Sequence, residues 1–316
     1  MTKIELLNIS NFYSSYYLLA LSEVGNLEYN PTEEFEKFNN RGFVIFRIGG
    51  KIGVIDNHDP VGVDAELYGK SDFYFATNKL KDNPSYNQQK VKPIFPHYPI
   101  NILGLYFRLY GISLVFKLKP RDLARELYVL NSRPSYKSLD ESNYQHHNYV
   151  FFSGSTWKKE SWANEIRARF IRACKANPKI EFEGGFIPRS DGNNFGYDEE
   201  LNTKKYGPKE FSHLSSKSLI SLNNPAVLGA VSWRLAEYWN SSSFVLSFPF
   251  QIDLPEFPKH DSEIHYLNDA DEYESIIQKA VDDKEFHAKI AKGGKKYFEK
   301  NCTPIAQGNY LLSFFK

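Results

Sequence analysis

Residues 232–238 place a hydroxyl, an indole, a guanidinium and a carboxylate at the start of a predicted helix. Arg234 offers a planar fork of donors that suits phosphate oxygens, and Glu237, on the same helical face, can accept hydrogen bonds from ribose hydroxyls. Backbone N–H groups at a helix start also attract phosphate. The pattern predicts a site for a nucleoside diphosphate that includes Ser232 and Trp233. A surface helix with an Arg–Glu pair is the alternative.

A second loop with groups suited to phosphate lies at residues 152–159. Gly154 lets the backbone approach a ligand, Ser155 and Thr156 carry hydroxyls, and Lys158 carries a positive charge. The loop is not a P-loop, because the pattern GxxxxGK[ST] is absent. Lys217 begins a third segment, which leads into the helix at 232. Together these segments predict the donor-binding part of a site.

Asp56, His58 and Asp59 form a cluster of two carboxylates and an imidazole at the end of a predicted strand. Any of them could act as a general base that takes a proton from an acceptor hydroxyl. The alternative is a turn in which the Asp side chains bind local backbone N–H groups. The cluster could also hold a metal ion. We expect no metal, because the second half already supplies cationic groups for a diphosphate.

Hydroxyl groups also precede the first predicted helix. Tyr13, Ser14 and Ser15 could form part of an acceptor site. A helix cap at Ser14 and core packing of the tyrosine are the alternatives.

The elements that would position these residues differ between the two halves of the chain. In the second half, short apolar strands alternate with helices, one of which is predicted at residues 161–176. This alternation predicts a parallel sheet covered on both faces and a ligand at the carboxyl ends of its strands. In the first half, residues 42–48 and 51–56 are predicted strands around a Gly-Gly turn. Residues 131–148 lack periodicity and predict a linker. We therefore expect two domains, 1–145 and 146–316.

Composition excludes several classes of protein. The net charge of +1 provides no field for nucleic acid, so we expect no nucleic-acid partner. The two cysteines, Cys174 and Cys302, belong to no metal-binding or disulfide pattern, and the start of the chain does not read as a signal peptide. These features favour a cytoplasmic protein. Residues 101–118 are largely apolar and predict a buried helix; an interfacial helix, with peripheral association at the inner face of the membrane, is the alternative.

The order of motifs resembles the nucleotide-binding half of GT-B glycosyltransferases, the bacterial surface-polysaccharide and exostosin-like enzymes in particular. The matching segments are FFSGSTWKK at 151–159, EFEGGF at 181–186, KSLISLNNPAVLGAVSWRLAEY at 217–238 and FVLSFPFQIDLP at 244–255. Two departures stand out: Gly229 replaces a second glutamate that many retaining members carry, and residues 239–243 replace an alanine-glycine tail.

The resemblance implies an α/β, GT-B-like fold of two Rossmann-like domains facing across a cleft. It also implies that Glu237 contacts the ribose and that the loop before its helix contacts the diphosphate. The expected activity is the transfer of a sugar from a nucleoside diphosphate sugar to a glycan or lipid-linked glycan, with the donor as substrate and no cofactor. A non-catalytic nucleotide- or glycan-binding protein of the same fold is the alternative. An NAD-linked oxidoreductase is disfavoured, because no GxGxxG follows an early strand.

Overall fold

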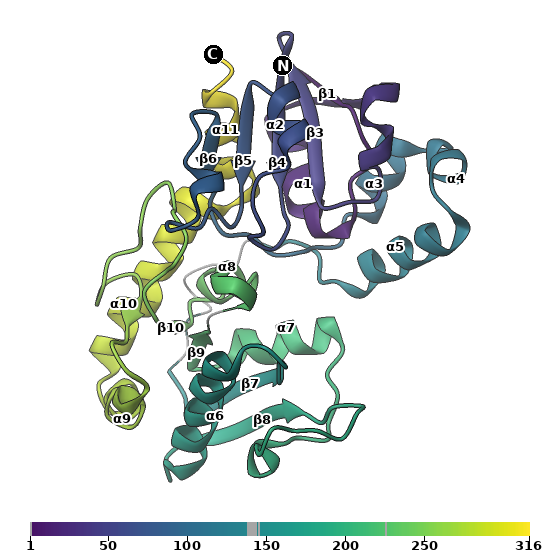
Figure 1. The fold of residues 1–316 in the computed structure, drawn as a ribbon. Helices are drawn as coiled ribbons and strands as arrows, with labels where there is room; N and C mark the ends of the chain where they lie inside the picture. Colours follow the sequence, from purple (N-terminus) through teal and green to yellow (C-terminus); the bar gives the residue numbers. More distant parts are fainter. Residues whose placement is uncertain (1, 138–143, 145, 225) are drawn as a thin grey trace.

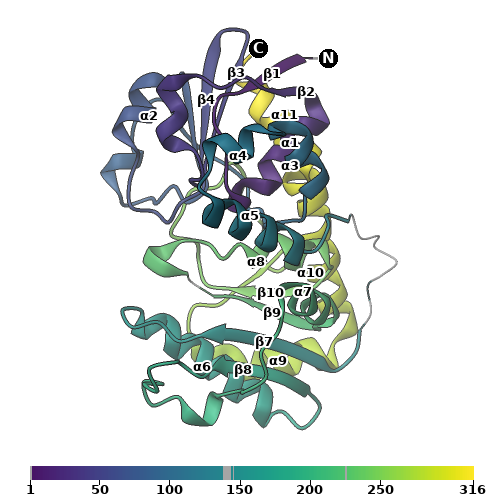
Figure 2. The same ribbon diagram turned by 90° about the vertical axis from the view of Figure 1, so that its right-hand side faces the viewer.

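The computed structural model describes residues 2–137, 144, 146–224 and 226–316. Two α/β halves lie one above the other in Figures 1 and 2, and the chain ends beside the half in which it begins. None of the helices in the described residues is long and apolar enough to cross a membrane.

A six-stranded mixed sheet forms the N-terminal half, with the strand order β2-β1-β3-β4-β5-β6. The strands are β1 (Thr2–Leu6), β2 (Gly25–Tyr29), β3 (Phe43–Ile48), β4 (Lys51–Asp56), β5 (Phe73–Ala76) and β6 (Val91–Pro93). β3 runs antiparallel to both of its neighbours, whereas β4, β5 and β6 are parallel. The predicted strands at 42–48 and 51–56 are therefore confirmed as a hairpin.

Alternation along β3 divides this half into two apolar layers. Val44 and Phe46 face the core that includes α1 (Ser15–Val24) and α11 (Pro304–Ser313), whereas Phe43 and Ile45 face a smaller core. The 3₁₀-helix η2 (Glu33–Phe38) and α2 (Ala65–Lys70) supply that smaller core. Because successive side chains of a strand point to opposite faces, an almost wholly apolar strand such as β3 must be covered on both sides.

Three helices follow β6 and lie on the right-hand side of this half in Figure 1: α3 (Leu103–Tyr110), α4 (Ser113–Lys117) and α5 (Pro120–Ser132). The single buried helix predicted at 101–118 is thus wrong in two respects. The helix breaks at Gly111, which has a φ of 47°, and only one side of it is buried.

Parallel strands build the C-terminal half. They are β7 (Tyr149–Ser155), β8 (Glu181–Ile187), β9 (Ile220–Asn223), β10 (Phe244–Ser247) and β11 (His265–Tyr266). β7 pairs with β8, and β10 lies between β9 and β11. The Leu219 N–H donates to the Tyr149 carbonyl at 2.8 Å and so joins β7 to the β9 side. Strand order along this edge is therefore β8, β7, β9, β10, β11, the order of a doubly wound sheet.

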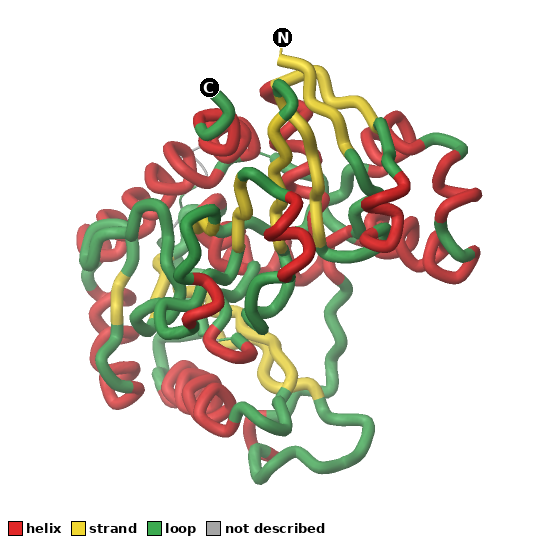
Figure 3. The backbone as a smooth tube through the Cα atoms, turned by 45° about the horizontal axis from the view of Figure 1, so that its top comes forward, coloured by secondary structure: helices red, strands yellow, loops and turns green. Residues whose placement is uncertain are grey.

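The helices of this half are α6 (Ser161–Ala176), α7 (Pro208–Lys217), α8 (Arg234–Asn240), α9 (Tyr273–Asp282) and α10 (Lys284–Tyr297). Figure 3 shows these helices in red around the short yellow strands. The predicted strand and helix alternation is confirmed, and α6 has the predicted bounds. The α/β fold with parallel sheets is likewise confirmed.

The last helix, α11, crosses back and packs against α1 of the N-terminal half. Gln307 Nε2 donates to the Pro96 carbonyl at 2.9 Å, and the Tyr310 hydroxyl donates to the Pro93 carbonyl at 2.9 Å. The predicted division at residue 145 falls at a position outside the described residues, as does much of the predicted linker. Of that linker, residues 131 and 132 are the end of α5.

Candidate functional site

An open cavity of about 460 Å³ lies between the two halves. Its N-terminal wall consists of residues that follow β4, β5 and β6 together with one residue of η1 (Phe12–Ser14), and its C-terminal wall consists of residues that follow β7, β9 and β10. The lining residues are Tyr13, Asn57, His58, Asp59, Thr77, Asn78, Pro96, His97, Trp157, Ala226, Val227, Ala230, Val231, Ser232, Trp233 and Ile252. Both halves therefore present the carboxyl ends of their parallel strands to this cavity, which is where ligands of such sheets ordinarily bind.

Two loops hold the halves together beside the cavity. Asn78 Nδ2 donates to the His58 carbonyl at 3.0 Å, and its Oδ1 accepts the Val231 N–H at 3.2 Å. Leu80 forms an antiparallel bridge with Ile252. Backbone and amide hydrogen bonds thus connect the two walls directly.

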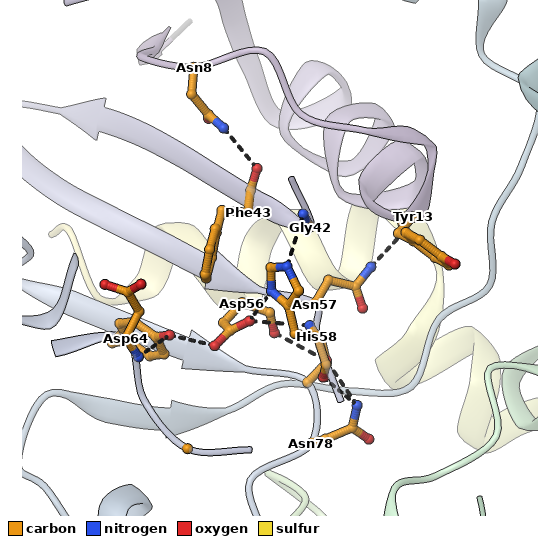
Figure 4. A network of polar contacts seen from close by, with 12 residues as sticks. Asn8, Tyr13, Gly42, Phe43, Asp56, Asn57, His58, Asp64 and Asn78 are labelled. Carbon is orange, nitrogen blue, oxygen red and sulfur yellow. Dashed lines mark hydrogen bonds and ion pairs between the residues drawn. The ribbon is translucent and has the colours of Figure 1, made fainter. Parts of the chain in front are cut away.

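Buried Asp56 and partly exposed His58 form a hydrogen-bond network, shown in Figure 4. Asp56 Oδ1 accepts the His58 Nδ1–H at 2.8 Å, and its Oδ2 accepts the Tyr74 hydroxyl. The Gly42 N–H donates to His58 Nε2 at 3.2 Å, so the proton of the neutral ring is assigned to Nδ1. Burial, together with the nearby Asp56 carboxylate, raises the pKa of Tyr74, which keeps its hydroxyl a donor. Both ring nitrogens of His58 are therefore engaged, and Asp56 acts as the group that orients the ring.

Asp59 differs from these two residues. It is exposed, it lines the cavity, and its carboxylate has no hydrogen-bond or ion-pair partner among the described residues. Of the three predicted catalytic residues, which the fold does bring together, Asp59 is the one with a free carboxylate at the cavity.

His97 is a cavity residue that the sequence reasoning did not select. Its Nδ1 lies 3.0 Å from the Tyr17 hydroxyl, and its buried Nε2 has no close hydrogen-bond partner in the described part of the chain. Burial lowers the pKa of His97 to about 4, so the ring is neutral near pH 7. The nearby Tyr13 backbone opposes part of the effect of burial on the His97 pKa. A neutral ring here can donate a hydrogen bond to a ligand oxygen without carrying charge.

The three predicted acceptor residues do not lie together at the cavity. Tyr13 lines the cavity and stacks on Trp233, with ring centroids 5.5 Å apart. Ser14 and Ser15 are buried, and Ser15 Oγ accepts the Ile100 N–H at 3.0 Å. Neither serine lines the cavity, so Tyr13 alone of the three reaches it.

On the donor side, Ser232 and Trp233 line the cavity, but Arg234 and Glu237 do not. Arg234 Nη1 lies 2.7 Å from Glu237 Oε2, and its guanidinium stacks 3.8 Å above the Phe211 ring. The Ser232 hydroxyl accepts the Arg234 N–H at 3.2 Å. The i, i+3 pair that was the alternative from sequence is thus formed.

Arg133, at the end of α5, brings a second guanidinium to this region. It lies 5.1 Å from the centre of the Trp233 ring, and its buried Nε has no hydrogen-bond partner within the described residues. Burial lowers the pKa of Arg133, and nearby Arg234 adds to this effect. The wall behind Trp233 therefore carries two cations, which Glu237 balances only in part. No sequence signal marked Arg133, because it fell in the predicted linker.

The predicted phosphate loop at residues 152–159 is built differently from the expectation. Gly154 and Ser155 belong to the end of β7, and the Ser155 carbonyl accepts a hydrogen bond from Arg167 at 2.8 Å. Thr156 is buried, with no hydrogen-bond partner for its hydroxyl among the described residues. Trp157, which the sequence did not single out, reaches the cavity instead.

The two predicted lysines lie outside the cavity lining. Lys158 Nζ lies 3.1 Å from Asp191 Oδ2, and Lys217 is exposed in the last turn of α7. Within the described residues, the histidine and acidic side chains close enough to share a metal ion are His260, Asp261 and His265, none of which lines the cavity.

The chemistry available at the cavity follows from this arrangement. Aromatic rings of Tyr13, Trp157 and Trp233 suit the face of a sugar or a base. Asp59 can accept a proton, and His97 can donate a hydrogen bond. The cavity volume falls within the usual range for small-molecule sites.

No protein-family model and no curated protein matches the sequence. Among solved structures, this chain is similar to a glycosyltransferase from Rickettsia africae, with 12% identity, a TM-score of 0.48, and coverage of 93% of this chain and 72% of that one. It is similar to HepE from Anabaena in complex with UDP, with 10% identity, a TM-score of 0.47, and coverage of 79% and 65%. A third is a proposed UDP-N-acetylglucosamine 2-epimerase from Listeria monocytogenes, with 11% identity, a TM-score of 0.45, and coverage of 99% and 95%.

Glycosyltransferases are thus among the structural neighbours of this chain, alongside an epimerase. At these identities the likeness concerns the fold alone.

Proposed function

We propose that this chain is a glycosyltransferase that moves a sugar from a nucleoside diphosphate sugar to a glycan or lipid-linked glycan in surface polysaccharide synthesis, without a metal ion. The observation that carries the proposal is the cavity shared by the two halves, with an unpaired carboxylate, Asp59, on one wall and two tryptophans on the other.

Donor binding is assigned to the C-terminal wall. Trp157 and Trp233 offer flat apolar faces for the base or the sugar. Arg133 and Arg234 lie behind Trp233 and supply positive potential for the diphosphate. An anion that enters beside them offsets their mutual repulsion, so no metal ion is needed to neutralise the leaving group.

Acceptor activation is assigned to Asp59. The acceptor oxygen forms a bond to the anomeric carbon of the donor sugar while the bond from that carbon to the diphosphate breaks. The acceptor proton passes to the Asp59 carboxylate, and the nucleoside diphosphate leaves with the bonding electron pair. His58, held by Asp56, supports the loop that carries Asp59, and His97 offers a hydrogen bond to a sugar hydroxyl.

The test separates binding from turnover. A thermal-shift screen against UDP, GDP, CMP and dTDP derivatives identifies the donor, because a ligand that binds only the folded state raises the melting temperature. Asp59→Asn is then expected to keep the donor-induced shift and to lose roughly 100- to 10,000-fold in kcat. Asp82→Asn, an exposed carboxylate outside the cavity lining, is the matched control. Full turnover by Asp59→Asn with an identified donor and acceptor contradicts the assignment.

A non-catalytic nucleotide- or glycan-binding protein is the second candidate. The observation that favours it is the engagement of predicted donor cations in internal ion pairs, Arg234 with Glu237 and Lys158 with Asp191. Ligand-induced stabilisation without turnover, in the wild type as in Asp59→Asn, supports this candidate.

A further inference from the structure

Large apolar side chains are exposed on three neighbouring helices, α3, α4 and α5, and on the turn between α3 and α4 (Figure 2). Phe107 is 50% exposed, Ile112 74%, Val115 65%, Phe116 78% and Tyr128 76%. Exposed apolar residues are ordinarily scattered singly, and a group of them marks an interaction site. We call this the α3–α5 surface and include in it the exposed basic residues Arg108, Lys119, Arg121 and Arg125.

The core does not require these apolar side chains. Tyr106, Tyr110 and Leu114 already fill the inner side of α3 and α4. Phe107, Ile112 and Phe116 lie on the opposite side, at positions that point away from that core. The helices thus carry apolar side chains on both sides, and no segment among the described residues packs against the outer side.

Basic residues outnumber acidic residues in these three helices. Residues 103–130 contain five basic and two acidic residues, in a chain whose net charge is +1. One of the two acids, Glu126, is buried, and its carboxylate accepts the Phe12 N–H. Lys117 pairs with Glu36, but the four basic residues of the α3–α5 surface have no ion-pair partner among the described residues.

We propose that the α3–α5 surface docks this protein on an anionic phospholipid surface. Exposed Phe, Ile and Val side chains can enter the boundary between headgroups and acyl chains, while Lys and Arg bind lipid phosphates with their ends. A second copy of this chain fits poorly, because a symmetric contact places the same four unpaired cations opposite one another. The combination of exposed apolar and unpaired basic side chains thus favours a lipid surface over a second copy of the chain as the binding partner.

The position of α5 connects this surface with the cavity. Glu126, on the buried side of α5, fixes the backbone of η1 through Phe12, and the next residue of η1, Tyr13, lines the cavity. A docked protein therefore holds the N-terminal wall of the cavity near the lipid, which suits an acceptor carried on a lipid. That consequence depends on the proposed function, whereas the docking itself does not.

Co-sedimentation of the full chain with vesicles tests the proposal. We expect binding to phosphatidylcholine vesicles that contain phosphatidylglycerol, weak binding to pure phosphatidylcholine, and a decline of binding with salt. Val115→Ser combined with Phe116→Ser should lower the partition coefficient about tenfold or more. Arg121→Gln combined with Arg125→Gln should weaken binding and reduce its salt dependence.

The control is Ile305→Ser, a change at an apolar residue of α11 that is 53% exposed and lies outside this surface. Circular dichroism and thermal melting establish that each variant is folded, and the donor-induced thermal shift should be unchanged in all of them. No sedimentation of the wild type, equal binding of the Val115/Phe116 variant, or a concentration-dependent dimer that this variant abolishes overturns the proposal.

Discussion

Glu126 gives a stability prediction whose sign and size follow from its surroundings. It is 3% exposed on the inner side of α5, and Oε2 accepts the Phe12 N–H at 2.7 Å. Burial raises its pKa to about 7 from an ordinary value of 4.5, against the opposing effects of this hydrogen bond and of Arg125. The folded protein therefore binds a proton at pH values where the unfolded chain has released it.

A carboxyl group with a raised pKa stabilises the fold at low pH. Its contribution is fully present below pH 4.5 and is lost as the pH rises through 7, because the ionised group is then buried. With about 1.4 kcal/mol for each pKa unit, the loss is about 3 kcal/mol. Glu126→Gln keeps an oxygen that can accept the Phe12 N–H and removes the charge. It should be more stable than the wild type by about 3 kcal/mol at pH 8 and equal to it near pH 4.5.

Urea unfolding of both proteins at pH 4.5, 6 and 8 measures this difference. Glu126→Ala removes the acceptor as well and should lack the full gain at pH 8. Glu23→Gln removes an exposed carboxylate of α1 and should not reproduce the pH dependence. A Glu126→Gln variant that is less stable than the wild type at pH 8, or a difference that does not vary with pH, refutes the reasoning.

Two further predictions concern the sheet and the cavity. Gly184→Ala should destabilise the protein by at least about 2 kcal/mol in thermal melts, because φ is 117° and the new Cβ would lie 1.9 Å from the Phe152 carbonyl oxygen. The control is Gly192→Ala, where φ is 73° and the space around the new Cβ is open, and this change should destabilise the protein by only about 1 kcal/mol. Trp233→Ala should lower the affinity for the nucleotide found in the screen about tenfold by calorimetry, whereas Trp162→Ala, 52% exposed on α6, should leave it unchanged.

Most of the C-terminal sheet was predictable because its signals are local. β7, β9 and β10 contain short apolar runs next to helices with a regular apolar face, and α6 was predicted at its observed bounds. β8 is only partly apolar, and β11 was not predicted. The contact of α11 with α1 was not predictable in this way. It depends on a close approach at Gly308, where an added Cβ would lie 2.5 Å from the Ala20 carbonyl oxygen, almost 300 residues earlier in the chain.

The cluster at the end of β4 was predictable in its location, although the roles within it were not. Alternation places Asp56 on the same face of β4 as Val54, which belongs to the buried core that also holds Tyr74. This alternation along the strand was the sequence signal that the Asp56 side chain points inward. The identity of its partner, Tyr74, depends on the pairing of β4 with β5, which a local pattern does not specify.

The cationic region behind Trp233 shows most clearly what only the assembled fold provides. Arg234 and Glu237 are three residues apart, so their pairing needs no more than a helix. Arg133 comes from the other half of the chain, and its effect on the site exists only where α5 meets α8. Because Arg133 and Arg234 repel each other in a partly buried setting, a ligand that brings negative charge to Trp233 gains from both at once. We therefore expect selectivity for anionic ligands at this wall to depend on the contact between the halves, and changes that separate the halves should weaken it even where every cavity residue is retained.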